Sequence, residues 1–401
     1  MTEPRLYDAM LRHHLAEHRQ MAFVSGPRQV GKTTTCRAQS TQYLNWDNTD
    51  DRQRILAGPG ALAEHLGLTR LSAGRKVALF DELHKYARWK ALLKGFFDTY
   101  ADDVRIIVTG SSRMDVFRRG GDSLMGRYFP YRMHPFSVAE LITQALPDPT
   151  HILRSPSDLA PARWLALWEH GGFPEPFLKC SAQFSRRWGT LRAEQLTRED
   201  IRDFTRVQEL GQLAALAHLL RYRSAQQLVF QNLANEVRIS TDTARRWVEA
   251  LRQLHLGFLV RPWFRNVSRS LRKEPKWFLR DWSGIEDEGS RAETFVACHL
   301  LKAVEGWTDM GLGQFELAYL RDKERREVDF VVIRDEKPWF LVETKLKQGP
   351  LSPALAHYQK QVNAPFAFQV ALQADFVDAN CFEKPRGPLG VPAKTLLSQL
   401  L

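Results

Sequence analysis

Short hydrophobic runs alternate with helical patterns over the first third of the chain. Each run has the length and residue types of a strand, and the intervening segments space apolar residues three or four positions apart, as amphipathic helices do. This alternation predicts an α/β fold in which a parallel sheet carries helices on both faces. The predicted strands are Met21–Ser25, Gln42–Trp46, Lys76–Phe80, Val104–Thr109 and Tyr128–His134.

From residue 136 to about residue 211 the apolar positions follow a helical period. The run Gly171-Gly172-Phe173-Pro174 is the one strong break, because glycine and proline both interrupt helices. We therefore predict a helical lid over residues 136–211, after an α/β core over residues 1–135.

A third pattern covers residues 212–281. Helices over Gln231–Val237 and Thr241–Leu254 flank a short turn, and strand patterns at Leu256–Trp263 and Lys276–Arg280 flank a basic hairpin. Two helices with a short joint, followed by a hairpin, predict a winged helix whose second helix is the recognition helix. Ser240 is a suitable N-cap for that helix.

Residues 282–401 predict a second, smaller α/β unit. Helical patterns at Arg291–Val304 and Pro353–Val362 enclose three strand patterns. These strand patterns are Phe315–Leu320, Glu327–Ile333 and Trp339–Thr344.

The length of 401 residues suits this modular organisation, since a domain usually takes roughly 100 to 200 residues. No uncharged apolar run reaches the about 18 residues needed to cross a bilayer, and no secretory signal is readable. The four cysteines lack the spacing of a zinc site and are expected to be reduced thiols. We therefore expect a cytoplasmic protein with no membrane partner.

The charge balance points to a polyanionic partner. A net charge of +11 and an isoelectric point near 9.6 favour phosphates, because clustered Lys and Arg release condensed counterions on meeting them. A basic protein with no nucleic-acid partner is the alternative.

The strongest motif runs from Gly26 to Thr33 and fits G-x-x-x-x-G-K-[ST] between a predicted strand and a predicted helix. Its glycines let backbone N–H groups surround a β-phosphate at the helix N-terminus. Lys32 is expected to reach the β- and γ-phosphate oxygens, and the Thr33 hydroxyl to coordinate Mg²⁺. The predicted ATP-binding residues are Gly26, Pro27, Arg28, Gln29, Val30, Gly31, Lys32, Thr33 and Thr34, together with Asp81.

Asp81 and Glu82 end an apolar strand, which places Asp81 at the carboxyl edge of the sheet beside the phosphate loop. We expect Asp81 to hold the hydration shell of Mg²⁺ and Glu82 to polarise the attacking water. An acid pair that caps a helix is the alternative. Ser111 follows the strand Val104–Thr109 and is a candidate sensor of the γ-phosphate or the water.

Several motifs together resemble the bacterial and archaeal AAA-superfamily ATPases that carry a C-terminal domain of unknown function. They are the phosphate loop, Phe80-Asp81-Glu82, Thr109-Gly110-Ser111-Ser112, Gly126-Arg127-Tyr128, His134-Pro135-Phe136-Ser137-Val138-Ala139-Glu140-Leu141 and Gly171-Gly172-Phe173-Pro174-Glu175. The resemblance covers nearly the whole chain.

This resemblance implies further roles. Arg127 or Arg113 would contact a γ-phosphate, with an arginine finger across a subunit boundary as one form of that contact. Gly172 and Pro174 resemble the glycine and proline in the lid of signal-transducing ATPases. A homo-oligomer, with a hexameric ring as one form, is therefore expected.

The predicted winged helix supplies the candidate DNA contacts. Thr243, Arg245 and Arg246 on the second helix are placed to face a major groove, as is Arg252, while Ala244, Trp247, Val248 and Leu251 form its inward stripe. Arg269, Arg272 and Lys273 make the hairpin a basic wing able to follow phosphates. A winged helix that mediates only protein contacts is the alternative.

The C-terminal unit has the order of acids and lysine found in the PD-(D/E)xK nuclease fold. Asp329 begins one strand, and Glu343 and Lys345 end the next. Two carboxylates of this kind hold Mg²⁺ or Mn²⁺ that activates water, and the lysine steadies the nucleophile. Glu293 on the preceding helix matches the extra acid of this fold, and Gln359 is an auxiliary candidate.

The resulting hypothesis is an Mg-ATP-hydrolysing motor or remodelling protein that acts on DNA and carries a nuclease-like domain. The main alternative is a regulatory ATPase switch of the signal-transducing type, in which nucleotide state controls partner binding and the nuclease-like domain is an inactive scaffold.

Overall fold

The computed structural model describes residues 3–70, 75–110, 124–196, 210–263, 274–384 and 387–401. Backbone contacts divide the chain into two compact units. The first unit contains Met1–His134 with Gln144–Leu146, and the second contains Pro135–Thr143 with Pro147–Leu401.

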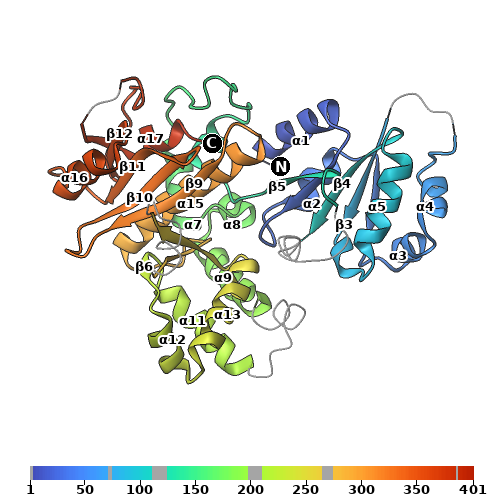
Figure 1. Ribbon diagram of the computed structural model, residues 1–401, viewed down its shortest axis with the longest axis horizontal. Coiled ribbons are helices and arrows are strands. Elements are labelled where there is room, and N and C mark those ends of the chain that lie inside the picture. The colour runs from blue at the N-terminus through green and yellow to red at the C-terminus, as the bar shows by residue number, and fades with distance from the viewer. Residues whose placement is uncertain (1–2, 71–74, 111–123, 197–209, 264–273, 385–386) are drawn as a thin grey trace. The chain divides into compact units, whose positions relative to one another are not determined.

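The first unit is a five-stranded parallel sheet in the order β2-β3-β4-β1-β5, with helices around it (Figure 1). The predicted α/β fold with a parallel sheet is therefore confirmed. Its strands are β1 (Met21–Ser25), β2 (Gln42–Asn45), β3 (Lys76–Asp81), β4 (Val104–Gly110) and β5 (Tyr128–Arg132). Its helices are α1 (Leu6–Glu17), α2 (Lys32–Ala38), α3 (Thr49–Leu56), α4 (Pro59–His65), the 3-10 helix η1 (Leu83–Lys85) and α5 (Trp89–Tyr100).

Helices cover both faces of this sheet because alternate strand residues point to opposite sides. Met21 and Phe23 of β1 join a hydrophobic cluster that includes side chains from α3, α4 and α5. Ala22 and Val24, between them, are also buried, and α1 and α2 contact the strands β1, β3 and β4. The central strands are thus buried on both sides, as apolar runs without alternation predict.

The second unit combines helices with an eight-stranded mixed sheet in the order β13-β12-β11-β10-β9-β7-β8-β6. The strands are β6 (Gln226–Gln227), β7 (Gly257–Pro262), β8 (Lys276–Leu279), β9 (Phe315–Arg321), β10 (Glu327–Arg334), β11 (Lys337–Lys345), β12 (Phe366–Ala371) and β13 (Leu389–Pro392). The helices are α6 (Val138–Ile142), α7 (Pro161–His170), α8 (Pro174–Lys179), α9 (Ala182–Gln195), α11 (Leu210–Tyr222), α12 (Phe230–Val237), α13 (Thr241–Gln253), α15 (Glu288–Asp309), α16 (Pro353–Val362) and α17 (Ala393–Ser398).

Two helices pack on the larger part of this sheet. α15 runs along β9, β10 and β11 and also contacts β8 (Figure 1). α16 packs on β10, β11 and β12, where Leu355, Tyr358 and Val362 join the hydrophobic cluster of those strands. The sheet therefore has a hydrophobic core beneath each of these helices.

The sheet passes from the predicted winged-helix segment into the predicted nuclease-like segment through β7 and β9. These strands pair in parallel at only two positions, Arg261 with Ala318 and Pro262 with Tyr319. The Tyr319 hydroxyl donates to the Glu274 carbonyl at 2.7 Å and accepts from Gln227 Nε2 at 2.9 Å. Tyr319 of β9, which follows the predicted boundary at residue 281, thus contacts Gln227 and Glu274, which precede it.

Among the residues that the structure describes, no helix is long and apolar enough to cross a membrane.

Candidate functional site

The phosphate loop follows β1 in a backbone conformation that depends on glycine. Gly26 and Gly31 have φ angles of 151° and 103°, and Gln29 between them has a φ of 64°. A Cβ atom added to Gly26 would lie 2.3 Å from the Met133 carbonyl oxygen, so only glycine fits there. The loop leads into α2, whose first turn contributes the backbone N–H groups that suit a phosphate.

Lys32 folds back into this loop. Its ammonium group donates to the carbonyl oxygens of Gly26 at 2.9 Å and Pro27 at 2.7 Å. Burial lowers the pKa of Lys32 to about 8, and the carboxylates of Glu82 and Asp81 partly oppose that shift. The ammonium group of Lys32 therefore lies at the loop, where it donates to two carbonyl oxygens. Phosphate oxygens of a bound nucleotide can take the place of these carbonyl oxygens.

Hydroxyl groups from three elements converge on Asp81. One carboxylate oxygen accepts from Thr33 Oγ1 at 3.0 Å and from the Tyr43 hydroxyl at 2.9 Å. The other accepts from Thr109 Oγ1 at the end of β4. Mg²⁺ prefers oxygen ligands, and Thr33 and Asp81 offer a hydroxyl and a carboxylate that could hold it, so they stay the predicted ligands of the ion. Together with the glycine-lined loop, these residues fit Mg-ATP.

Glu82 lies next to Asp81 in a left-handed conformation, with a φ of 55°. Such a φ is costly for a residue with a side chain, and residues held in it concentrate at functional sites. Its carboxylate lies 3.6 Å from Lys85 Nζ and 3.8 Å from His84 Nε2. Burial raises the pKa of Glu82 above its ordinary value, although Lys85 opposes this. A carboxylate with a raised pKa is a stronger base.

The remaining predicted nucleotide-site residues have varied positions. Arg28, Gln29 and Thr34 are exposed around the loop, whereas Pro27 and Val30 are buried beneath it. Ser111 and Arg113 lie outside the described residues.

Arg127 does not lie beside the phosphate loop. It precedes β5, whose first residue pairs with Met21 at the start of β1, whereas the loop follows the other end of β1. Its guanidinium group makes two hydrogen bonds to Asp98, at 2.7 and 2.9 Å. The predicted contact of Arg127 with a γ-phosphate is therefore wrong for a nucleotide bound by the same chain, because one strand length separates Arg127 from the loop. Contact across a subunit boundary stays a prediction.

Three site residues were missed from the sequence. Tyr43 and Thr109 hold Asp81, but recognising them requires the strand order, which puts β2 and β4 on either side of β3. The guanidinium group of buried Arg5 donates to the Val30 carbonyl and to the His134 carbonyl, each at 2.6 Å. Arg5 directly precedes α1, and its position in the sequence did not predict these contacts with the loop.

The segment predicted as a winged helix contains α11, β6, α12, α13, β7 and β8. Strand β8 pairs antiparallel with both β6 and β7, and the three helices contact one another. The Ser240 hydroxyl accepts from the Thr243 N–H at 3.1 Å, so the predicted N-cap is confirmed. The predicted inward stripe of α13 is also confirmed, since Ala244, Trp247, Val248 and Leu251 are buried.

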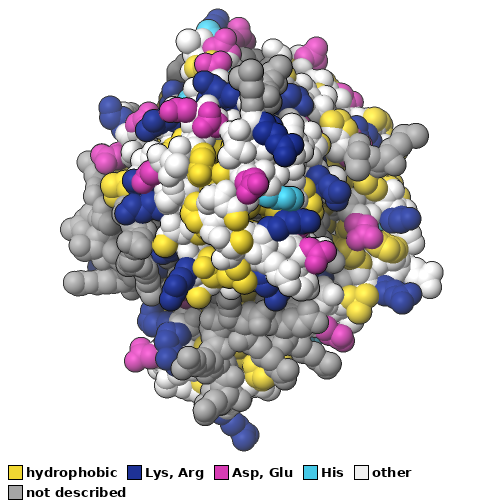
Figure 2. Space-filling model, turned by 90° about the vertical axis from the view of Figure 1, so that its right-hand side faces the viewer, with side chains coloured by type: hydrophobic (Ala, Val, Ile, Leu, Met, Phe, Trp, Pro, Cys, Tyr) yellow, Lys and Arg dark blue, Asp and Glu magenta, His cyan; other side chains and the backbone are white. Residues whose placement is uncertain are grey.

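The candidate DNA contacts on α13 lie outside this stripe. Arg245 and Arg246 are exposed, and Thr243 is half-buried. Arg245 stacks over the Phe230 ring at 4.6 Å, while Arg252 pairs with Glu249 at 2.6 Å. Arg269, Arg272 and Lys273 lie outside the described residues. On the face shown in Figure 2, Lys and Arg side chains are interspersed with Asp and Glu.

The predicted nuclease-like residues lie close together, but with a lysine among them. Lys276 of β8 places its ammonium group 2.8 Å from Glu293 Oε1, 2.6 Å from Glu327 Oε1 and 3.5 Å from Asp329 Oδ1. The sequence contained a signal for this contact, because Lys276 begins the apolar run Trp277-Phe278-Leu279. A charge in such a run is expected to be buried, and a buried charge needs a partner.

Asp329, Glu343 and Lys345 also have hydrogen-bond partners on β11. Asp329 Oδ2 accepts from the Thr344 N–H at 2.8 Å, and Lys345 donates to Glu343 Oε1 at 2.8 Å. Gln359 is half-buried on α16. Within the described ranges, no group of three or more His, Cys, Asp or Glu side chains is arranged to hold a metal ion. With Lys276 in place, these residues do not fit a divalent ion.

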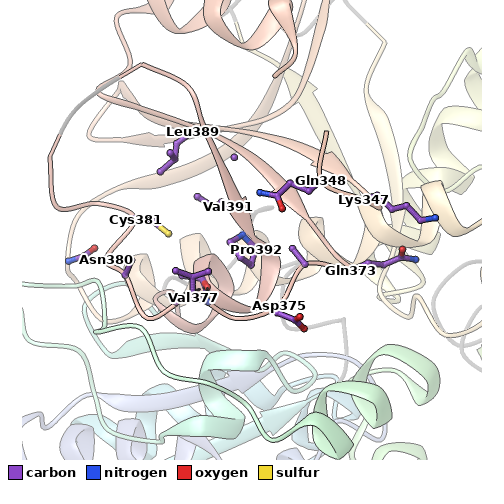
Figure 3. Close-up of a pocket in the computed structure, with 14 residues that line it drawn as sticks. Lys347, Gln348, Gln373, Asp375, Val377, Asn380, Cys381, Leu389, Val391 and Pro392 are labelled. Atoms are coloured by element: carbon purple, nitrogen blue, oxygen red, sulfur yellow. Dashed lines mark hydrogen bonds between the residues drawn. The ribbon is translucent and has the colours of Figure 1, made fainter. Parts of the chain in front are cut away.

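A pocket of about 770 Å³ opens nearby, beyond the carboxyl ends of β11 and β12 (Figure 3). Lys347, Gln348, Gln373 and Asp375 follow those strands and line it together with the buried Cys381. Its lining mixes polar and apolar groups and contains none of the predicted site residues.

Comparison with known proteins identifies one family by name and two without a function. Residues 18–142 match the AAA domain. Residues 162–285 match a domain of unknown function (DUF8612), and residues 288–373 match another (DUF4143).

Two relatives in mycobacteria are similar over most of the chain. They are the uncharacterized protein Rv2008c of Mycobacterium tuberculosis and the uncharacterized protein Mb2031c of Mycobacterium bovis. Each is 25% identical over an alignment of 353 residues, and the match covers 83% of this chain and 72% of the relative.

Two solved structures share 14% identity with the chain. The Aeropyrum pernix ORC1 protein in complex with DNA has a TM-score of 0.31, covering 73% of this chain and 93% of that one. PCH-2 of C. elegans has a TM-score of 0.22, covering 62% and 67%. The family match covers residues 18–142 and includes the phosphate loop, so this part of the chain is similar to AAA domains.

Proposed function

We propose that the chain binds Mg-ATP, hydrolyses it and uses the hydrolysis to act on DNA. The observation that carries this proposal is the convergence of Lys32, Thr33, Asp81 and Glu82 at the carboxyl edge of a parallel sheet. Ligands of open α/β sheets bind at this edge.

Each of these residues has a distinct role in the proposal. Lys32 exchanges its two carbonyl partners for β- and γ-phosphate oxygens. Thr33 and Asp81 hold Mg²⁺, which neutralises charge on the transferred phosphoryl group. Glu82 orients the attacking water and accepts its proton, which its raised pKa favours.

Nucleotide binding and turnover by two variants test this part. Lys32→Ala should abolish nucleotide binding, while Glu82→Gln should bind ATP but hydrolyse it on the order of 10²–10⁴ times more slowly, the usual contribution of a general base. Glu64→Gln makes the same chemical change on the exposed face of α4 and should keep the wild-type rate. Wild-type turnover by Glu82→Gln would remove Glu82 from the mechanism.

The proposed action on DNA rests on the exposed Arg245 and Arg246 of α13, on the basic sequence over residues 265–273 that is predicted to form a hairpin, and on the charge of +11. Phosphate contacts release counterions, so affinity should fall steeply with salt. Replacing Arg272 and Lys273 by Gln should flatten the slope of log affinity against log salt by about 1 to 2 units, and Arg245→Gln with Arg246→Gln should do the same.

A matched double variant controls for net charge. Arg12 and Arg19 are exposed on the first unit, and changing both to Gln removes the same charge. An equal effect of this pair, or an unchanged slope in the α13 and hairpin variants, would place the DNA contacts elsewhere.

The main alternative is a regulatory switch in which DNA has no part. Measuring ATP turnover with and without single-stranded, duplex and branched DNA separates the two, since only the first proposal expects stimulation. Assembly into a homo-oligomer, with a hexameric ring as one form, belongs to the same proposal and is measurable by mass in solution.

The C-terminal segment has two candidate roles, a metal-dependent nuclease and an inactive scaffold. The ion pairs of Lys276 favour the scaffold, because they occupy carboxylates that a metal would need. Cleavage assays on the same DNA forms with Mg²⁺ or Mn²⁺, using protein that hydrolyses ATP, distinguish these roles.

A further inference from the structure

Lys276 is one of the most deeply buried charged residues in the described part of the chain, with 3% of its surface exposed. Three carboxylates surround its ammonium group, at 2.6 Å for Glu327, 2.8 Å for Glu293 and 3.5 Å for Asp329. They come from β10 and α15, whereas Lys276 comes from β8. The charge therefore has partners that are distant in sequence, as a buried charge requires.

One of these partners, Asp329, is a predicted ligand of the divalent ion, and another, Glu293, is the predicted extra acid of the nuclease-like fold. A metal ion at this place would have to share their oxygens with the ammonium group. Mg²⁺ binds its ligands at about 2.0–2.1 Å, and a second cation within the same cluster would repel it strongly in a buried site. The Lys276 ammonium group thus occupies the place between Glu293 and Asp329 that a metal ion would need.

We propose that Lys276 is the resident cation of this carboxylate cluster, and that it excludes a divalent ion from Asp329. The cluster then serves as an internal ion-pair network that joins β8 to β10 and α15. This assigns the nuclease-like segment a structural role and goes beyond the ATPase function proposed above.

The charges of the cluster are consistent with this assignment. Its four carboxylates, Glu293, Glu327, Asp329 and Glu343, face three cations, because Arg321 binds Glu327 at 2.8 Å and Lys345 binds Glu343 at 2.8 Å. Each of the four carboxylates therefore lies beside a cation that the chain itself supplies.

Mn²⁺ binding to the full-length, nucleotide-free protein tests the proposal, with bound and free Mn²⁺ separated by electron paramagnetic resonance. The four proteins are wild type, Asp329→Asn, Lys276→Met and the double variant. Methionine keeps a long side chain without its charge, and asparagine keeps an oxygen that can accept from Thr344 N–H. Any Mn²⁺ held at the phosphate loop is common to all four proteins and cancels in each comparison.

Wild type and Asp329→Asn should bind the same number of Mn²⁺ ions per chain. Lys276→Met should bind one more than the double variant, because removing the ammonium group frees Glu293 and Asp329. Lys276→Arg keeps the charge and should behave as wild type.

Two results would overturn the proposal. One is a wild-type chain that binds one Mn²⁺ more than Asp329→Asn, which would show that Lys276 does not exclude the metal. The other is a folded Lys276→Met protein that gains no site. If Lys276→Met shows no cooperative unfolding transition and is therefore not folded, the comparison of wild type with Asp329→Asn still shows whether the wild-type site excludes the metal ion. None of these measurements requires ATP turnover, so they stand apart from the test of the ATPase.

Discussion

At the scale of single residues, buried His14 makes the stability of the first unit depend on pH. Its Nε2 lies 2.8 Å from the Gln20 carbonyl oxygen, and its Nδ1 lies 2.8 Å from the Tyr131 hydroxyl. Since a carbonyl only accepts, Nε2 carries the proton and Nδ1 accepts from the hydroxyl of Tyr131. Burial is the main cause that lowers the pKa of His14 from 6.5 to about 4, and nearby His18 and Arg105 add to it.

This shift predicts loss of stability in mild acid. Between pH 6.5 and about 4 the unfolded chain binds a proton at His14 that the folded chain does not. The associated stability is fully present above pH 6.5 and is lost as the pH falls to about 4, which amounts to roughly 3 kcal/mol. Urea unfolding of wild type and His14→Gln at pH 7, 5.5 and 4 measures the difference in slope.

The neighbouring His13 is the matched control, because its side chain is exposed on the same helix. His13→Gln should change the pH slope much less than His14→Gln, because the charge of His13 is the smallest of the causes that lower the pKa of His14. Equal slopes for wild type and His14→Gln would contradict the prediction.

At the scale of elements, a buried ion pair fixes the short helix α6 to α15. The Lys302 ammonium group donates to the Glu140 carboxylate and, at 3.0 Å, to the Pro135 carbonyl oxygen. Glu140 is 0% exposed and Lys302 is 1% exposed. Because α6 has only five residues, its position depends on such contacts with α15 more than on its own helical stability.

Breaking this pair from one side should be costly. Lys302→Met removes the cation that donates directly to the buried Glu140 carboxylate and should destabilise the second unit by about 3–5 kcal/mol. The double variant with Glu140→Leu removes both charges at similar volume and should recover most of that loss. Unfolding free energies of the two single variants and the double variant measure the coupling, and a double variant as unstable as Lys302→Met would refute it.

Many elements were predictable from the sequence because burial left a periodic pattern. Strand β1 and helix α16 have the predicted bounds, and β3 and β4 extend the predictions by one residue. Strand β6 consists of two glutamines and has no apolar signal, since only pairing with β8 makes it a strand. Strand β13 is four residues long and contains glycine and proline, so its local pattern is equally weak.

At the scale of the whole molecule, the phosphate loop was predictable because its chemistry depends on residues that are adjacent in sequence. The groups around Asp81 and Asp329 were only partly predictable, because Tyr43, Thr109 and Lys276 reach them from other strands. Sequence spacing places two acids at a sheet edge, but it does not reveal which neighbouring strand brings a hydroxyl or an ammonium group to them.

The predicted domain boundaries can be compared with the two units that backbone contacts define. Hydrophobic periodicity places boundaries at residues 135, 211 and 281, and the first unit of the structure ends its main segment at His134. The second unit contains both later boundaries, because its sheet continues from β8 and β7 into β9. A change of pattern along a chain therefore need not coincide with a division of its hydrogen bonds.

The two residue pairs between β7 and β9 have a practical consequence for anyone who divides this protein. A chain cut at residue 281 would leave β7 as an uncovered edge strand, and in the remaining piece β9 would be uncovered in the same way. Exposed edge strands pair readily with strands of other molecules. Self-association of either piece would therefore reflect the cut edge, and only the intact chain can report the protein's own oligomeric state.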